Sequence, residues 1–573
     1  MMDRRFFLAL LLTALVVVAT PFVFPGMRQA PSGTPATADS VRATGAAGTA
    51  GAAAAPTMRA DTALRAAGDT GAVAQRPPLV LDTTTVDAGG SVYGFLNVGA
   101  TPISVKVKNY EDLSTAAKND TVQLVPPGER LMRFRFVVGP GDTISLDTIP
   151  MRVEQAPAEA GGAPALRFTG STARGPVEIS YRFVPGDSTY LAHVSGRIAN
   201  VPQGSRLLVD LPRGLESAEV DTLEDLRHLA YSYKRGNQDV ESFAFAKLDT
   251  GRARTDTGSI AWVAVRNKYF LTALIGTDDT EPFRSLRVRG GPAVAKGVVP
   301  QAQATAALEL EQGAFGFQLY AGPQKYERLN TIGRDLVNVN PYGGWFAGMV
   351  QPFATIVMRV LLWLKQTTML SYGWVLVIFG ILIRVLIWPL NQSAMRSSIK
   401  MQRLQPQMQE IQAKYARDPE KLRTEMMKMY ADHGMSPFSP VLGCLPMLIP
   451  MPVLFALYFV FQNTIEFRGV EFLWLPDLTL KDPYYITPIF MGASMLFLSW
   501  IGMRGAPQTP QTKMMGYAMP AMMTLLFLNF PSGLNLYYAV QNVVALPQQW
   551  LIARERKKAG VGTAPVMPAR TKA

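Results

Sequence analysis

Apolar runs of membrane-spanning length constrain the fold of this chain more than any other feature of its sequence. Most of them lie between residues 341 and 552, where charge is confined to short stretches. Six runs approach the length needed to cross a bilayer, at 6–24, 372–390, 441–461, 484–501, 514–530 and 533–552. The core of a soluble protein rarely needs so many. The sequence therefore predicts an α-helical integral membrane protein with six transmembrane helices.

The net charge and the few cysteine and histidine residues limit the kinds of site that the chain can contain. A net charge of +13 invites a nucleic-acid interpretation, but the basic residues form no continuous patch, so no specific nucleic-acid recognition is expected. They cluster beside the apolar runs, which is how membrane proteins encode orientation. Cys444 is the only cysteine, and the three histidines (His193, His228 and His433) have no paired spacing. We expect no disulfide, no metal site and no cofactor.

The N-terminal region is predicted to be an anchor followed by a linker. Arg4 and Arg5 precede the apolar run 6–24, which is long for a signal peptide and has no small-x-small cleavage site directly after it. A cleaved signal peptide is the alternative to a retained anchor at 1–25. Residues 26–75 are rich in Ala, Gly, Thr and Pro and bury too little apolar surface to offset their ordering entropy, which predicts a flexible linker.

Residues 76–322 show the period-two alternation of β-strands. Runs such as 104–108 (SVKVK) and 133–137 (RFRFV) are separated by turn residues such as Pro185-Gly186-Asp187. This pattern predicts a large all-β sandwich, which the anchor would place outside the cytoplasm. The acids of this region are dispersed and no Gly-rich loop precedes a helix, so a structural or docking role is expected.

Orientation follows from the charges that flank the apolar runs. Segment 396–432 carries eight Lys/Arg against five Asp/Glu, whereas the loop 464–483 carries four acids against two bases. The positive-inside rule places the first segment in the cytoplasm and the second outside. If 345–364 were a further span, the two segments would lie on the opposite sides of the membrane, against the rule. We therefore expect an interfacial helix there, within a connector at 323–368, and both termini inside.

A cytoplasmic helical hairpin is predicted at 393–434, inside a membrane core at 369–552 that a basic tail at 553–573 follows. Asp418-Pro419 starts its second helix and Gly434 is placed to end it. The two helices have seams of large apolar residues at steps of three and four: Met401, Leu404, Met408, Ile411 and Tyr415, and then Leu422, Met426 and Met429.

The candidate site centres on Arg384, which lies in an apolar run otherwise free of charge. A buried membrane arginine normally faces a polar cavity or a partner; the alternative is that Arg384 reaches to the cytoplasmic interface. The last run adds polar side chains at a spacing of four on two faces: Asn535, Tyr537, Tyr538, Gln541 and Asn542. Hydrogen bonding between helices explains each of them singly, but together they suggest a hydrophilic recess.

These residues resemble the YidC-type membrane protein insertases, which are related to the mitochondrial and chloroplast insertases. The resemblance covers 250–573 by motif and 76–250 by pattern. It is carried by Leu382-Ile383-Arg384 with Trp388-Pro389-Leu390, Leu404-Gln405-Pro406 with Glu425-Met426-Met427, Gly443-Cys444-Leu445-Pro446 with Met451-Pro452, Phe530-Pro531-Ser532-Gly533-Leu534 with Tyr537-Tyr538, Trp262-Val263-Ala264, and Tyr320-Ala321-Gly322-Pro323.

The resemblance implies a five-helix insertase core around a groove that is open to the cytoplasm and the lipid. It gives Arg384 and Tyr538 the family's groove positions and adds Met451 and Gly380, the latter standing where many relatives have a polar residue. It implies a non-enzymatic insertase and chaperone that inserts and helps fold proteins of the inner membrane, with its large domain in the periplasm. Nascent membrane proteins and the lipid bilayer are the implied partners, with the ribosome and the general secretion channel beside them.

Two other classes of protein fit the sequence less well. A transporter or channel predicts charges paired across spans and usually an inverted repeat, and neither is evident. A transmembrane sensor would need an output domain, yet only a short basic stretch follows Trp550.

Overall fold

The computed structural model describes residues 81–558 except for short gaps. The gaps are 115–116, 118–119, 140, 157–163, 187–189, 278–279, 293–300, 341–346, 416–417, 434–450 and 505–509. The predicted anchor and linker at 1–75, the predicted tail beyond 558, Gly434 and Cys444 lie outside the described residues.

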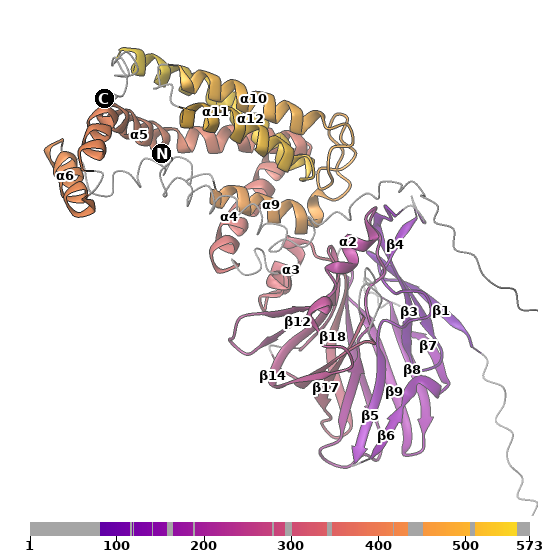
Figure 1. Ribbon diagram of the computed structural model, residues 1–573. Helices are drawn as coiled ribbons and strands as arrows, with labels where there is room; N and C mark the ends of the chain where they lie inside the picture. Colours follow the sequence, from indigo (N-terminus) through magenta and orange to yellow (C-terminus); the bar gives the residue numbers. More distant parts are fainter. Residues whose placement is uncertain are drawn as a thin grey trace, which may run out of the picture. The chain divides into compact units, whose positions relative to one another are not determined.

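Residues 83–323 form two antiparallel sheets (Figure 1). The smaller sheet has the order β1-β2-β3-β4, and the larger one has the order β6-β5-β11-β17-β16-β14-β15-β18-β10-β9-β8-β7 with β12 and β13 branching from β14. The strands are β1 (Thr83–Asp87), β2 (Ser91–Leu96), β3 (Thr101–Glu111), β4 (Thr121–Gln123), β5 (Arg133–Gly139), β6 (Asp142–Ser145), β7 (Met151–Ala156), β8 (Ala165–Thr172), β9 (Gly175–Phe183), β10 (Leu191–Ile198), β11 (Arg206–Asp210), β12 (Ala230–Arg235), β13 (Glu241–Ala244), β14 (Ala253–Arg266), β15 (Phe270–Ile275), β16 (Phe283–Gly290), β17 (Ala302–Glu309) and β18 (Ala314–Pro323).

The predicted alternation produces the core of this β domain. In β5, Phe134, Phe136 and Val138 are buried while the residues between them are partly exposed. Strands of both sheets contribute to a single apolar core, in which the rings of Phe95 and Tyr181 meet at 4.7 Å. The prediction of a large β-rich domain is confirmed. Short helices interrupt the strands: η2 (Leu146–Thr148), α2 (Thr222–Arg227) and η3 (Phe245–Lys247).

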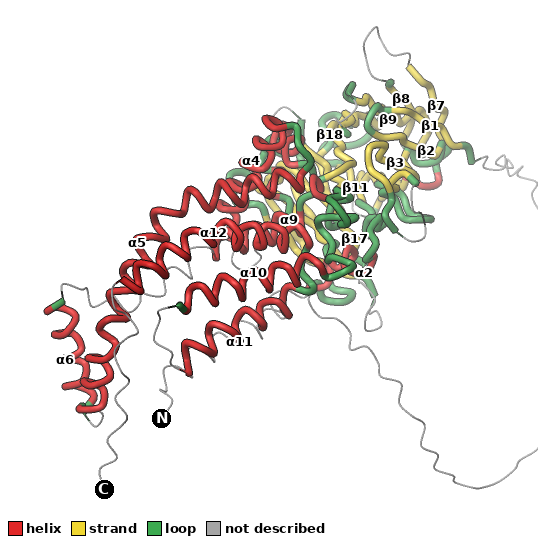
Figure 2. Tube along the Cα trace, turned by 90° about the horizontal axis from the view of Figure 1, so that it is seen from above, coloured by secondary structure: helices red, strands yellow, loops and turns green. Residues whose placement is uncertain are grey.

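The C-terminal half is helical and its long helices lie side by side (Figure 2). Helix α12 packs against α10 and α5, and α4 packs against α9 and α5. The helices are α3 (Tyr326–Ile332), η4 (Leu336–Asn338), α4 (Ala347–Thr368), α5 (Tyr372–Lys414), α6 (Pro419–Asp432), α9 (Met451–Asn463), η6 (Ile465–Phe467), α10 (Ile486–Met503), α11 (Pro510–Phe527) and α12 (Ser532–Lys558).

Two helices of the described part of the chain are long and apolar enough to cross a membrane, over Tyr372–Pro389 and Ile486–Met503. Shorter apolar helices occupy Val453–Asn463 and Gly516–Phe527. The predicted helix at 345–364 exists as α4; one of its faces is buried, while Phe353, Ile356 and Trp363 are exposed. The six-span count and the interfacial position of α4 stay predictions.

The predicted second span and the first arm of the predicted hairpin belong to one helix in the structure. Helix α5 runs unbroken for 43 residues from Tyr372, so the first arm of the hairpin is its continuation. A change from apolar to polar side chains does not by itself end a helix, and α5 also continues through Pro389 and Pro406.

The second arm of the hairpin begins as predicted. The side chain of Asp418 accepts a hydrogen bond from the amide of Lys421 at 3.1 Å, and Pro419 occupies the first turn of α6. Leu404 and Met429 are buried between the arms. The sequence pattern omitted Tyr430, which is also buried and whose hydroxyl contacts the sulfur of Met408 at 3.8 Å.

Candidate functional site

Helix α12 carries polar side chains toward two neighbouring helices. Tyr537 and Gln541 face α5, where the Nε2 atom of Gln541 donates to the carbonyl of Gly380 at 2.7 Å and to the hydroxyl of Tyr537 at 3.2 Å. Asn542 instead faces α10 and donates to the Oγ atom of Ser494 at 3.0 Å. The spacing of four explains the two faces, since Tyr537 and Gln541 lie on one face of the helix and Asn542 lies on the next.

Gly380 is a close-approach point between α5 and α12. A Cβ atom at this position would lie 3.0 Å from Cγ1 of Val540 and 3.7 Å from Cδ2 of Tyr537. The glycine thus lets the two helices approach, and its own carbonyl takes the place of a polar side chain as the acceptor for Gln541. A Cβ atom here would require the side chain of Val540 to shift by a few tenths of an ångström.

Arg384 lies one turn further along α5 and is half-buried. Its Nη2 atom donates to Oε1 of Gln548 at 2.9 Å, and the Nε2 atom of Gln548 donates back to the carbonyl of Trp388 at 3.2 Å. Gln548 therefore holds the guanidinium group and the following turn of α5 together. The Nε atom of Arg384 is buried and has no partner among the described residues, so the group keeps an unused donor.

Gln548 is a site residue that the sequence analysis did not single out. It is 1% exposed and lies seven residues after Gln541, which places both on the same face of α12. The seven-residue spacing was the available signal.

The other predicted residues have structural partners. Asn535 is buried and donates to the carbonyl of Phe527 at 3.1 Å, while its own Oδ1 atom has no partner in the described residues. The ring of Tyr538 packs against Phe527 and Tyr537, each at 5.4 Å. Met451 begins α9, and its side chain lies outside the described residues. The structure thus brings Arg384, Gly380, Tyr537 and Gln541 together, and Asn542 turns toward α10.

Two acids of the loop 464–483, Asp477 and Asp482, lie at the starts of α12 and α10 rather than beside Arg384. Asp482 accepts hydrogen bonds from the amide of Thr487 at 2.6 Å and from its hydroxyl at 2.9 Å, in the first turn of α10. The carbonyl of Asp477 accepts from the Oγ atom of Ser532, the first residue of α12. Among the described residues, no acid forms an ion pair with Arg384.

The sequence of the chain matches two known families. Residues 84–356 match the YidC periplasmic domain, and residues 363–559 match the 60Kd inner membrane protein. A solved structure described as an active YidC insertase is 20% identical, with a TM-score of 0.34, covering 82% of this chain and 92% of that chain.

Curated relatives extend these matches. A membrane protein insertase YidC of Anaeromyxobacter sp. (strain Fw109-5) is 35% identical, and the match spans about half of that relative, 54%, and 55% of this chain. A membrane protein insertase YidC of Syntrophus aciditrophicus (strain SB) is 30% identical over 80% of this chain and 83% of that relative. A periplasmic β domain followed by an inner-membrane helical core is the class that the matches define. The chain belongs to the YidC family of membrane protein insertases, which is not a family of enzymes.

Proposed function

We propose that this chain inserts nascent membrane proteins into the inner membrane through a polar recess between α5, α10 and α12. The observation that carries the proposal is Arg384: a permanent cation in an apolar helix, held by the neutral side chain of Gln548 rather than by an acid. A charge in the membrane without a counter-ion is costly, so a residue that carries one usually marks a functional site. Family membership supports the same function.

The recess lowers the barrier for a polar tail that must cross hydrocarbon. A polar group that enters the bilayer without a partner costs several kcal/mol. Arg384, Tyr538 and the amides on α12 supply hydrogen-bond partners part of the way, and the cation attracts an acidic tail. The apolar segment of the guest then moves sideways into lipid, driven by its own hydrophobicity. This step uses no nucleotide from this chain.

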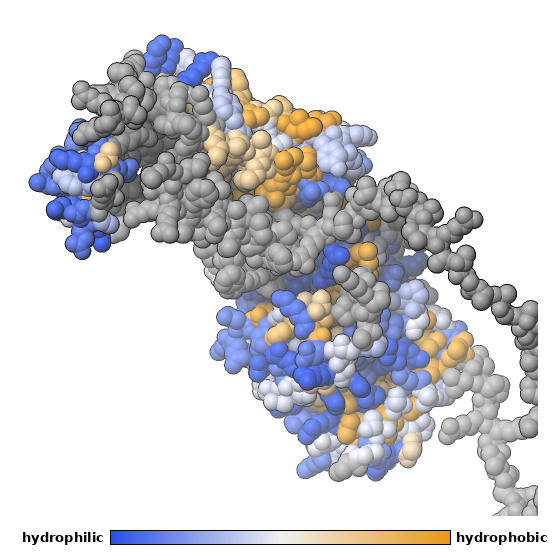
Figure 3. Space-filling view, viewed as in Figure 1, coloured by the Kyte–Doolittle hydropathy of each residue, from blue (hydrophilic) through white to orange (hydrophobic). Residues whose placement is uncertain are grey.

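The arrangement of the helices in the membrane is part of the proposal. Six spans with both termini in the cytoplasm would put the β domain in the periplasm and the α5–α6 hairpin in the cytoplasm. Hydrophilic side chains cover α6, whereas apolar ones gather over α10 and α11, which supports this placement (Figure 3). On α10 and α11, large apolar side chains are exposed where lipid would lie: Phe490, Phe497, Trp500 and Leu525.

The partners are also proposed. Nascent membrane proteins would enter from the cytoplasmic side, where the hairpin and the basic tail would meet the ribosome, and the general secretion channel would act beside the core. A transporter or channel is the competing function. It predicts a counter-charge for Arg384, and among the described residues the contact of its guanidinium is with an amide.

Depletion of the protein tests this function. Newly made inner-membrane proteins should stop inserting and remain accessible to protease in the cytoplasm, while the uptake of small solutes stays unchanged. Restoring the chain should restore insertion, and restoring a variant that lacks 372–390 should not. Normal insertion after depletion, together with a defect in solute uptake, would instead favour the transporter.

A further inference from the structure

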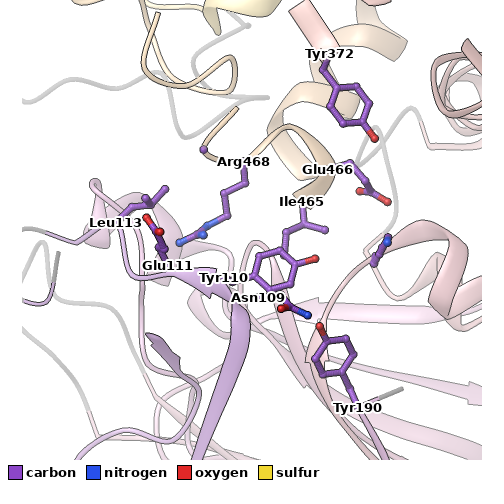
Figure 4. Close-up of a pocket in the computed structure, with 11 residues that line it drawn as sticks. Asn109, Tyr110, Glu111, Leu113, Tyr190, Tyr372, Ile465, Glu466 and Arg468 are labelled. Carbon is purple, nitrogen blue, oxygen red and sulfur yellow. The ribbon is translucent and has the colours of Figure 1, made fainter. Parts of the chain in front are cut away.

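A cavity lies where the β domain meets the first turn of α5, away from Arg384 (Figure 4). Its volume is 560 Å³, within the range typical of small-ligand sites. Segments far apart in the sequence line the cavity. The β domain contributes Tyr110 of β3 and Tyr190, which precedes β10. The helical part contributes Lys325, which precedes α3, Tyr372 at the start of α5 and Glu466 of η6.

The carboxylate of Glu466 has an unused acceptor. Its Oε1 atom accepts a hydrogen bond from the amide of Tyr326 at 2.9 Å, but its Oε2 atom is buried and has no partner in the described part of the chain. Burial raises the pKa of Glu466 to about 7. A buried carboxylate oxygen without a hydrogen-bond partner is stabilised by a ligand whose charged group donates a hydrogen bond to it.

The two basic residues that line the cavity differ in whether they form a close ion pair. Arg468 forms an ion pair within the chain: its Nε atom lies 2.6 Å from Oε1 of Glu219, and its Nη2 atom donates to the carbonyl of Ala218 at 2.8 Å. Lys325 forms no ion pair within 4 Å of any described acid, and its charge acts on the carboxylate of Glu466 from further away. The cavity therefore offers a lysine ammonium group without a close acid and, near it, a carboxylate oxygen without a hydrogen-bond donor.

The aromatic rings add a third element of recognition. The side chains of Tyr110, Tyr190 and Tyr372 line the same cavity, and the hydroxyl of Tyr372 points toward Glu466 (Figure 4). The faces of such rings attract ammonium groups, as the Nζ atom of Lys365 already does at 5.5 Å from the centre of the Tyr372 ring. Tyr110 and Tyr190 are therefore the rings that a ligand would contact. A ligand with an ammonium group and, a few ångströms away, a phosphate group would satisfy the rings, Glu466 and Lys325 together.

We propose that this cavity binds the phosphoethanolamine headgroup of an aminophospholipid. Tyr372 is the first residue of an apolar helix long enough to span, so the cavity lies at the level of one membrane surface, where headgroups are the abundant zwitterions. A primary ammonium donates a hydrogen bond to Oε2 of Glu466, and a trimethylammonium cannot. Ethanolamine is therefore selected over choline. The site is separate from the proposed insertion activity and does not depend on it.

Lipid binding to the purified full-length chain in detergent tests the proposal. Phosphatidylethanolamine, phosphatidylcholine and phosphatidylglycerol with the same acyl chains would be titrated and the bound lipid counted by native mass spectrometry. Loss of a charged hydrogen bond changes affinity by about tenfold or more. Glu466→Gln should therefore bind phosphatidylethanolamine about tenfold more weakly, and no better than phosphatidylcholine. Lys325→Gln should weaken both phosphatidylethanolamine and phosphatidylglycerol.

Two exposed residues on the same loop provide matched controls, Glu471→Gln and Lys481→Gln, which should bind all three lipids as the unaltered chain does. Soluble phosphoethanolamine should compete with phosphatidylethanolamine on the unaltered chain, and phosphocholine should not. The competition experiment needs no variant, so it tests the proposal even if Glu466→Gln unfolds. Equal affinity for ethanolamine and choline headgroups would overturn the proposal. Binding of soluble phosphoethanolamine without binding of the lipid would also overturn the lipid as its occupant.

Discussion

Arg384 is positioned by a neutral residue, Gln548, rather than by an acid of the described chain. Its Nη2 atom is held by Gln548 at 2.9 Å while its Nε atom keeps an unused hydrogen. If the charge attracts acidic tails, Arg384→Ala should impair clients with acidic translocated tails most, and Arg384→Glu should be worst because it repels them. Arg384→Lys should retain much of the activity, since a point charge acts through a wet recess without bidentate geometry.

The measurement is insertion of paired clients that differ only in tail charge, normalised to the amount of insertase. If Arg384 only anchors its helix, acidic and neutral tails should lose insertion equally and the abundance of the protein should fall. Indifference to tail charge in all three variants would reject the electrostatic role.

Gln548 allows the charge of Arg384 to be cancelled without removing it. In Gln548→Glu the introduced carboxylate would lie within reach of the guanidinium group and neutralise it. We expect this variant to lose its preference for acidic tails, as Arg384→Ala does, while its abundance stays normal. Gln549→Glu, the neighbouring residue on the side of α10, is the matched control and should keep the preference. A normal preference in Gln548→Glu would show that Arg384 acts elsewhere than at this contact.

At the scale of single elements, α2 places a pH-sensitive group at its C-terminus, His228. Burial, followed by the nearby charges of Lys268 and Arg266, lowers the pKa of His228 to about 3 from its usual 6.5. Between these values the unfolded chain binds the proton and the folded chain does not. The stability present above pH 6.5 is therefore lost progressively as the pH falls toward 3.

The thermal unfolding temperature of His228→Gln should accordingly fall less between pH 7 and pH 5 than that of the unaltered chain. Glu466, whose pKa is raised to about 7, acts in the opposite direction in this range, but it is present in both chains and cancels in the comparison. His193→Gln, an exposed position on β10, should behave like the unaltered chain. Parallel changes with pH in all three chains would contradict the assignment to His228.

The elements also show what local patterns could and could not predict. Alternation predicted the buried face of β5, and the Asp418-Pro419 pair predicted the start of α6, because each depends on neighbours in sequence. The continuity of α5 from the span into the hairpin was not predicted, because a change of polarity along the chain neither ends nor continues a helix. The contact of Arg384 with Gln548 joins residues 164 positions apart, and no local periodicity determines such a pairing.

At the scale of the whole molecule, the β domain and the helical core share a buried ion pair. Arg468, on the loop after η6, meets Glu219 of the β domain, and both side chains are almost fully buried. Removing one partner of such a pair leaves an uncompensated charge and is strongly destabilising. The pair therefore fixes the loop that connects α9 to α10 against the β domain.

The proposed orientation predicts which residues an impermeant thiol reagent reaches in intact cells with a permeable outer membrane. On a background in which Cys444 is replaced by serine, a cysteine near Lys414 at the end of α5, or near Lys557 at the end of α12, should be protected. A cysteine near Thr250, in a turn of the β domain, should be labelled. Each variant should be labelled after the membrane is opened, which controls for burial of the thiol. The charge difference between 396–432 and 464–483 is the physical reason, since basic loops stay in the cytoplasm. Labelling near Lys414 in intact cells would reverse the core and with it the side from which a guest would enter.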